Sequence, residues 1–488
     1  MSLTTICGVS VLRSLIISLT GVYLCQSLSS LIDRTESRIS FFLWLLILAP
    51  LLVPELIVGY IWSLLTTQLI HYPALAEFVY SMLVLMRVVP AGIICYHMTV
   101  RPQISAEADF IRQSASTAGT AISRFSAQWN FFIRKTLVRI FPVWSLLFLL
   151  AFQEFEMASL LYMNSWTVWI FDAQAGGVPV SETLGYLVGP LLIEFVILAG
   201  VLYLLRILEQ RPFYLQSPGR TVSRRLRPLL AGCYLALATG CVILLPLVML
   251  GWGGLLSLKS VLQNRLQMMG TLEECAWGLG YAATSGIAAW GLATIFFNRN
   301  QSGFVKFLGL VCCVPGLCGS LTLSLVIASL FLTREGAWLY GTPVPVMIGF
   351  VLYLLPRAVF LKLFFQRRNA DDALFLAHLM NQSNCPQQAE NGGRLLWLTR
   401  GRMQYWAVVV LAFWVYWDVT ISSILAPHSG MTSAVRLYGL MHYGQTSVLS
   451  AICLISFCIP ALLGIILLPV VRKLWIRFSS QSELNQFV

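Results

Sequence analysis

The stretch VLSAICLISFCIPALLGIILLPV, residues 448–470, decides the fold class of this chain. It holds no charged residue, and as an α-helix it is long enough to cross the roughly 30 Å hydrocarbon core of a membrane. The whole chain has the same character: 58% of its 488 residues are apolar, 11% are charged, and the mean hydropathy is +0.78. Soluble domains keep about a quarter of their residues charged. The composition therefore predicts an all-α polytopic membrane protein.

Eleven apolar runs have the length of a membrane-spanning helix. Their approximate bounds are 8–31, 41–63, 77–98, 137–156, 184–206, 229–251, 276–297, 307–331, 344–366, 403–425 and 448–470. The first run is the least apolar and contains Arg13. A cleaved signal peptide is the alternative there, although the run shows no charged n-region and no small-residue cleavage site.

The basic residues are distributed unequally between the two sides that these spans define. With the N-terminus outside, the cytoplasmic segments and the span ends facing them hold 25 of the 32 lysines and arginines, and the outer side holds five. The other two, Arg87 and Arg357, lie within spans. Because cytoplasmic segments carry an excess of Lys and Arg, we expect an outer N-terminus and a cytoplasmic C-terminus in the cell (inner) membrane. The net charge of +12 then follows from topology and requires no nucleic-acid partner.

The residues that usually carry chemistry form no recognisable motif. Most of the twelve cysteines lie inside apolar runs without CxxC spacing, and the five histidines are dispersed and form no HExxH motif. We therefore expect buried, unpaired thiols, no metal centre, no cofactor and no enzymatic activity. The chain also lacks a GxxxxGK[ST] phosphate loop, so any ATP hydrolysis must come from a partner.

Two parts of the sequence resemble each other. LAFQEFEMASLL (150–161) is similar to LAFWVYWDVTISSIL (411–425), and each ends a span. Prolines occupy matching spans in the two parts, Pro54 with Pro315 and Pro90 with Pro356. This parallel repeat predicts a first half of about five spans, a polar cytoplasmic linker, a second half of about six spans and a cytoplasmic tail, at 1–207, 208–228, 229–478 and 479–488. Such repeats are common in transporters, where a substrate path forms between the halves.

The segment GMTSAVRLYGLMHYG (430–444), between the last two spans, is too short to cross a membrane. Its apolar residues recur at i, i+3, i+4 and i+7, which predicts a short amphipathic helix whose polar Thr432, Ser433 and Arg436 point away from the apolar face. The residues expected on that face are Met431, Ala434, Val435, Tyr438 and Met441.

This segment closely resembles the one before the last span of type I ABC importer permeases of the ferric-iron type, whose single chain carries two fused permease halves. SLIISLTGVYLCQSLSSLIDRTESR (14–38) is similar to the family's first core span. The family's signature cytoplasmic loop reads Glu-Ala-Ala, three residues, then Gly. The positions matching it are Gln113, Ser114, Ala115 and Gly119 in the first half, and Asp372, Ala373 and His378 in the second.

The resemblance implies about 11 transmembrane helices in two repeated type I ABC permease halves, which work by alternating access. Two cytosolic ABC ATPase subunits would bind the two signature loops, and an extracytoplasmic solute-binding protein would deliver a small solute. Ferric iron is the family-level substrate, with thiamine, a polyamine or another small solute as alternatives. An amide, Gln113, replaces the usual acid and His378 replaces the glycine, so coupling is expected to be weakened, asymmetric or directed to a divergent ATPase.

The same resemblance implies a role for the helix within 430–444. It would be a gate element on the outer face, where the binding protein docks, with Arg436 and His442 near the cavity mouth. Tyr438 and Met441 would anchor it on the bundle. The alternative is a helix that only packs the outer loop on the bundle.

Ionisable side chains inside spans are expensive, and they are functional candidates for that reason. Carboxylate oxygens suit hard cations such as ferric iron. Glu154 and Glu156 are two positions apart, so on one helix they diverge by about 200° and face a single ion only if the helix is broken there. Lining a cavity or a helix end is the alternative to cation contact, and the arginines are either interior partners of Glu55 or Glu194 or snorkelling residues. The candidates are Glu55, Arg87, Glu154, Glu156, Glu194, Arg357 and Asp418.

Other classes of function stay open at this point. An ion-coupled secondary transporter would need carboxylates deep in the bundle, and Glu55 or Glu194 could serve. A membrane-embedded enzyme would need a clustered nucleophile or metal set, which the sequence does not offer, and a scaffold would need neither.

Reporter fusions test the topology. Fusions at residues 115, 218 and 385 should report the cytoplasm, and fusions at 175, 260 and 437 the outer side, because the basic residues follow that division. Paired reporters, each active on one side only, provide the measurement. An outer location for residue 218 would contradict the organisation in two halves.

Overall fold

The computed structural model describes most of the chain. The described residues are 2–32, 35–66, 68, 71–98, 138–209, 226–298, 301–366, 375–377, 379–380, 386–442 and 446–481. Within them every regular element is a helix, which confirms the expected all-α class. The chain divides into two compact units, Met1–Leu247 and Val248–Val488, and the division falls downstream of the linker expected at 208–228.

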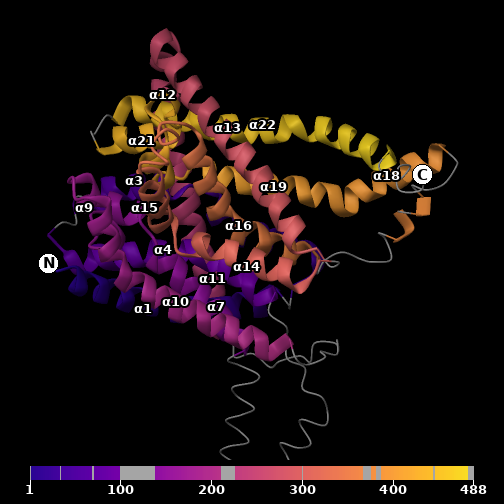
Figure 1. Cartoon of the computed structure of the whole chain (residues 1–488), viewed down its shortest axis with the longest axis horizontal. Helices are drawn as coiled ribbons and strands as arrows, with labels where there is room; N and C mark the ends of the chain where they lie inside the picture. Colours follow the sequence, from indigo (N-terminus) through magenta and orange to yellow (C-terminus); the bar gives the residue numbers. More distant parts are fainter. Residues whose placement is uncertain are drawn as a thin grey trace, which may run out of the picture. The chain divides into compact units, whose positions relative to one another are not determined.

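Unit 1 is built on its first helix. Its elements are α1 (Leu3–Ile32), α2 (Ser37–Leu52), α3 (Glu55–Thr66), α4 (Pro73–Met98), α7 (Val138–Phe152), α8 (Glu156–Leu160), α9 (Trp166–Ala175), α10 (Val180–Glu209), α11 (Leu226–Ala238), the π-helical η3 (Thr239–Leu244) and the start of α12 (Leu245–Gln263). α1 packs on α4 and α7, and α7 packs on α10 (Figure 1). Glycines allow this close approach, because a Cβ at Gly21 or Gly92 would lie 2.8 or 2.7 Å from the side chain of Leu147.

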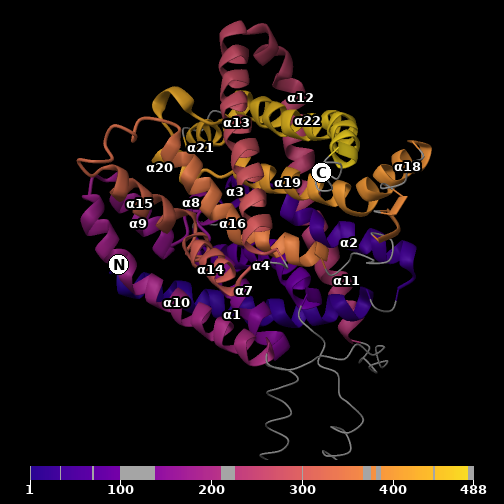
Figure 2. The same cartoon turned by 45° about the vertical axis from the view of Figure 1, so that its right-hand side comes forward.

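Unit 2 is built around α13 and α16. Its elements after α12 are α13 (Arg265–Phe296), α14 (Gly303–Leu317), α15 (Ser320–Phe331), α16 (Val344–Gln366), α18 (Pro386–Leu396), the π-helical η4 (Trp397–Gly401), α19 (Arg402–Tyr416), α20 (Thr420–Leu425), η5 (His428–Gly430), α21 (Ser433–His442) and α22 (Thr446–Gln481). Figure 2 shows α15 and α20 beside α16. Gly349 of α16 lies where they meet, since a Cβ there would be 3.1 Å from side chains of Ile421 and Leu425.

The helices are those of a membrane-embedded protein. Eight of them in the described ranges are long and apolar enough to cross a membrane, and ten spans result if each of two bent pairs counts as one. The most apolar of them is Val448–Ile476, which contains the uncharged run 448–470. The number is close to the eleven spans expected, and the differences lie at breaks in the helices.

Two expected spans, 41–63 and 307–331, are bent pairs. α2 and α3 meet at 77°, and α14 and α15 meet at 104°. Pro54 stands at the first break, where its ring and missing N–H stop a continuous helix. At the second break Gly319 has φ 85°, a conformation that glycine adopts at little cost.

The span expected at 403–425 is not one continuous helix. α19 ends at Tyr416, α20 begins at Thr420, and neither is among the helices long enough to cross. A carboxylate oxygen of Asp418 accepts a hydrogen bond from the backbone N–H of Ile421 at 2.8 Å, so α20 has a capped start of its own. The span expected at 137–156 contains the same kind of break, because α7 ends at Phe152 and α8 begins at Glu156.

The contact between α14 and α16 gives a stability test. A Cβ at Gly316 would lie 2.2 Å from the carbonyl oxygen of Leu352 and 2.9 Å from Pro356, so Gly316→Ala should force the helices apart and lower stability by about 1–3 kcal/mol. Gly280→Ala in α13 is the matched control, because no atom lies within 4 Å of its added Cβ and alanine favours a helix. Thermal unfolding of both variants in detergent measures the difference. Equal melting temperatures would contradict the close packing.

Candidate functional site

Polar side chains of unit 1 gather at its two helix breaks, α2–α3 and α7–α8. The short helices α3 and α8 pack on each other at Gly59, where a Cβ would come within 2.8 Å of the side chain of Leu160. A break inside a membrane leaves backbone amides and carbonyls that water cannot reach, and protein groups must satisfy them. The side chains that do so form the candidate site.

Arg87 of α4 holds the α2–α3 break together. One guanidinium nitrogen donates to the carbonyl oxygen of Pro50 at 2.9 Å and also to that of Val53, which are near and just beyond the end of α2. A second nitrogen lies 2.8 Å from a carboxylate oxygen of Glu55, the first residue of α3. Arg87 therefore satisfies carbonyls at the end of one half-helix and pairs with the carboxylate at the start of the other. This is the interior-partner role that the sequence left open for Arg87.

Glu154 holds the α7–α8 break. Its carboxylate accepts the backbone N–H groups of Met157 at 2.6 Å and Ala158 at 3.1 Å, in the first turn of α8. It also accepts the hydroxyl of Tyr80, from α4, at 2.6 Å. Glu154 is 7% exposed and Glu156, at the start of α8, is 9% exposed. The helix is thus broken between the two glutamates, which is the condition under which both could face one ion.

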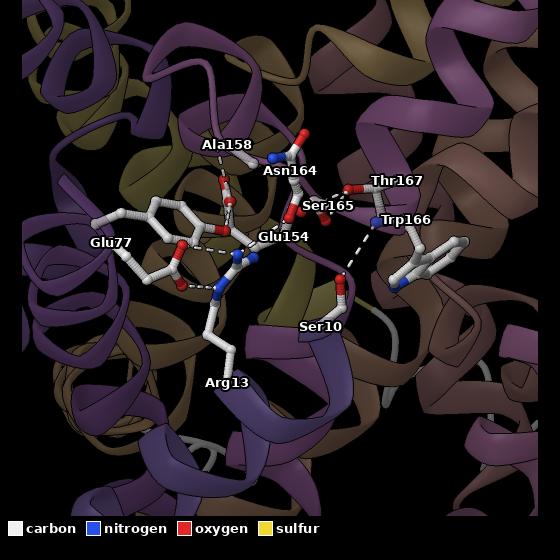
Figure 3. Close-up of polar contacts among 10 residues, drawn as sticks. Ser10, Arg13, Glu77, Glu154, Ala158, Asn164, Ser165, Trp166 and Thr167 are labelled. Atoms are coloured by element: carbon white, nitrogen blue, oxygen red, sulfur yellow. Dashed lines mark hydrogen bonds and ion pairs between the residues drawn. The ribbon is translucent and has the colours of Figure 1, made fainter. Parts of the chain in front are cut away.

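Arg13 of α1 extends this cluster (Figure 3). Its guanidinium pairs with both carboxylate oxygens of Glu77, donates to the carbonyl oxygen of Asn164 at 3.0 Å, and lies 4.8 Å from the centre of the Tyr80 ring. The segment that follows α8 is fixed by Thr167, whose hydroxyl donates to the carbonyl oxygen of Glu154 at 2.8 Å. Helices α1, α4, α8 and α9 are therefore joined by one buried network.

The two ion pairs at these breaks are partly accessible. Arg13 and Arg87 are buried, whereas the side chains of Glu77 and Glu55, with which they pair, are 40% and 38% exposed. The accessible part of the cluster consists of carboxylate oxygens, which attract hard cations.

Glu194 of α10 is fully buried and contacts the α7–α8 break through Gln153. One carboxylate oxygen accepts a hydrogen bond from the side-chain amide of Gln153 at 3.1 Å, and the other has no hydrogen-bond partner among the described residues. A buried carboxyl group with a neutral partner is costly to ionise inside a membrane. Within the described residues Glu194 forms no ion pair with an arginine, so the pairing that the sequence left open is not found there.

Unit 2 has a less charged set of contacts at its own breaks. Asp418 caps α20, and the hydroxyl of Tyr416 donates to the sulfur of Cys275 at 3.3 Å while it accepts from Ser433 at 3.0 Å. Lys362 of α16 is buried and donates to the carbonyl oxygens of Ala293 at 3.2 Å and Thr294 at 3.1 Å, near the end of α13. A carboxylate caps the short helix α20 as in unit 1, whereas an amine, Lys362, and not a guanidinium group, reaches the carbonyl oxygens at the end of α13.

Arg357 does not act as Arg87 does. Its guanidinium donates to the carbonyl oxygen of Tyr353, one turn earlier in the same helix, at 2.8 Å, and lies 3.7 Å from the centre of that tyrosine ring. It therefore joins no second helix through these contacts.

The helix expected within 430–444 is present as α21, but its faces differ from the expectation. Ser433, Ala434 and Leu437 are buried, and Met431, expected on the apolar face, is 40% exposed. Ser433 is buried because it hydrogen bonds to Tyr416. The periodicity of the apolar residues could not reveal that contact.

The expected gate residues are engaged in contacts of α21. A guanidinium nitrogen of Arg436 lies 2.7 Å from a carboxylate oxygen of Glu274 in α13, so its charge links two helices and is not free for a docking partner. Tyr438 and His442 contact each other, with ring centres 4.5 Å apart. The structure thus favours the packing alternative for this helix.

The remaining expectations concern parts that the structure does not describe. Outside the described ranges lie the residues of the expected coupling loops, Gln113, Ser114, Ala115, Gly119, Asp372, Ala373 and His378.

Among the residues that are described, no three His, Cys, Asp or Glu side chains are grouped as a metal site would require.

Several members of these contacts were not predicted from the sequence, among them Arg13, Glu77, Tyr80 and Lys362. The sequence did carry a signal for the Arg13–Glu77 ion pair, because each of the two residues is a lone charge near the end of an apolar run. Tyr80 and Lys362 gave no comparable signal. Tyrosine is common in spans, and Lys362 follows Arg357 as an ordinary basic residue near a span end.

No family model, no curated protein and no solved structure matches this chain. The functional argument therefore rests on the geometry of each unit and on the sequence patterns described above.

Arg87 of α4 and Arg357 of α16 give a matched test of the clamp at the α2–α3 break, by which we mean the contacts of Arg87 with Pro50, Val53 and Glu55. Arg87→Met should lower stability by about 2 kcal/mol or more, because two carbonyl oxygens and the Glu55 carboxylate lose their donor. Arg357→Met should cost less than about 1 kcal/mol, because only contacts within one turn are lost. Thermal unfolding in detergent compares them. A similar loss in both variants would show that the clamp adds nothing specific.

Proposed function

We propose that this chain is the transmembrane permease subunit of an ABC importer. In this proposal two repeated permease halves move a small solute across the cytoplasmic membrane by alternating access, driven by a partner ATPase. The observation that carries the proposal is a series of helices in unit 1 that can be matched, in the same order, to a series in unit 2.

Both units contain, in this order, a long helix, a bent pair, a second long helix, a helix that breaks before a short one, a separate short helix and a long helix. The corresponding elements are α1 with α13, α2–α3 with α14–α15, α4 with α16, α7–α8 with α19–α20, α9 with α21, and α10 with α22. The elements α11, η3, α12, α18 and η4 stand outside this correspondence. A capping carboxylate stands two residues before the short helix in each case, Glu154 before α8 and Asp418 before α20. Together with the similarity of 150–161 to 411–425, this supports a duplicated permease.

The proposed solute is a small cation, with ferric iron as the first choice. The accessible carboxylates of Glu55 and Glu77 would draw a cation toward the broken helices of unit 1. Thiamine and a polyamine, which also carry positive charge, fit the same electrostatics. No fixed metal centre is part of the proposal, because the ion would be passed along and not retained.

The partners are two copies of a cytosolic ABC ATPase and an extracytoplasmic solute-binding protein. The support for both is the resemblance of the loops around Gln113 and Asp372 and of the segment 430–444. Arg436 is engaged with Glu274, so the proposed docking surface on the outer side does not rely on its charge.

Glu194 favours a second candidate function, an ion-coupled secondary transporter. It is fully buried in α10, and one of its carboxylate oxygens has no hydrogen-bond partner in the part of the chain that the structure describes. Such a group within a membrane can carry a proton or a monovalent cation between two states.

Copurification tests the first candidate. Purification of the chain from its native membrane should recover a separate ATPase, and deletion of residues 107–127 should abolish the association while the chain still reaches the membrane. Reconstituted complex should then take up solute only with ATP and a loaded binding protein. Glu194→Gln should leave this uptake largely unchanged.

The opposite results would favour secondary transport. In that case no ATPase copurifies, the purified chain transports solute on an ion gradient alone, and Glu194→Gln abolishes gradient-driven uptake. Those results would contradict the importer proposal.

A further inference from the structure

A basic and aromatic surface in unit 2 plays no part in the proposed transport path. It lies where η4 meets the last turns of α22, two segments that are more than seventy residues apart in the chain. Figure 1 shows α18, which leads into η4, beside this end of α22. We call it the η4–α22 surface and define it by Arg400, Arg402, Arg472 and Lys473.

Gly401 brings the two segments into contact. A Cβ at this position would lie 2.5 Å from the ring of Trp397 and 3.0 Å from the ring of Trp475, so only glycine allows the approach. The two indole rings meet edge to face with centres 6.0 Å apart, and Trp397 is 4% exposed. The contact is therefore a packed joint between two segments.

Four basic residues lie next to the contact between Trp397 and Trp475. Arg400 and Arg402 flank Gly401, and Arg472 and Lys473 precede Trp475 by no more than one helical turn, so all four lie within a turn of the contact. Each of the four is exposed, and none forms an ion pair with another described residue. In the stretches 386–416 and 446–481 the sequence has one acidic residue, Glu390, and it pairs with Arg394 at 2.7 Å.

The neighbouring apolar side chains show what lies next to these charges. Leu398 of η4 is 59% exposed and Leu474 of α22 is 46% exposed. Each is within two residues of an exposed cation, and the span Val448–Ile476 ends at the same place. Tryptophan, arginine and lysine gather where a span leaves the hydrocarbon. Membrane topology alone requires cations at span ends, but it does not require two distant segments to bring them together.

We propose that the η4–α22 surface binds the headgroup of an anionic phospholipid. The four cations would neutralise its phosphate, with the arginines donating paired hydrogen bonds, while Leu398 and Leu474 contact its acyl chains. The occupant is a membrane lipid and not a soluble anion, because the exposed leucines beside the cations would otherwise face water. This inference is independent of the solute and of the ATPase.

Lipid binding to the purified full-length chain tests the proposal. The probes are nanodiscs of phosphatidylcholine with or without phosphatidylglycerol, and inorganic phosphate added to phosphatidylcholine alone. Phosphatidylglycerol should raise the melting temperature and be retained in native mass spectrometry. The variant Arg400→Gln/Arg402→Gln/Arg472→Gln should lower its retention by about tenfold or more, since each basic residue near an anionic surface contributes about fivefold.

Two matched variants keep the test decisive. Lys259→Gln/Arg265→Gln/Arg334→Gln removes three exposed cations elsewhere in unit 2 and should retain the lipid. Arg400→Lys/Arg402→Lys/Arg472→Lys preserves the charge and should retain most of the binding. Equal loss in the two glutamine variants, or no loss in either, would overturn the proposal. So would equal protection of the wild-type chain by inorganic phosphate.

Discussion

Every break in a membrane helix leaves backbone groups that neither water nor lipid can satisfy, and the structure depends on how those groups find partners. Arg87 supplies donors to the carbonyl oxygens of Pro50 and Val53. Glu154 and Asp418 supply acceptors to the first amides of α8 and α20. These partners come from the chain itself, so a helix can bend or stop within the bilayer. The α2–α3 bend and the interruptions before α8 and α20 depend on those few side chains.

The two units meet this requirement with different chemistry. Beside the α7–α8 break of unit 1 lie the charged side chains of Arg13, Glu77 and Glu154. In unit 2 Asp418 caps α20, and the hydroxyl of Tyr416, in the last turn of α19, bonds with Cys275 and Ser433.

Much of the fold could be predicted from the sequence, because span length and apolar content depend on the bilayer more than on contacts between residues. The run 448–470 and the all-α class needed no tertiary information. The breaks were harder to predict: Pro54 and Pro315 marked two bent spans, but nothing local marked the interruption of 403–425 beyond Asp418. The site was predicted in part. Glu55, Arg87 and Glu154 were named as charges within spans, whereas Tyr80 enters through a contact with Glu154, 74 positions away, which no local pattern encodes.

The two bent pairs differ in how they tolerate mutation over evolutionary time. The α2–α3 bend is held redundantly, since Pro54 blocks the helix even if Arg87 or Glu55 changes. The α14–α15 bend passes through Gly319 with φ 85°, which side-chain-bearing residues rarely adopt, so nearly every missense change at one codon strains it. Drift should therefore accumulate at the charged bend, where one change can be offset by another. At the α14–α15 bend no second change can compensate for the loss of Gly319, so purifying selection would act on that one position.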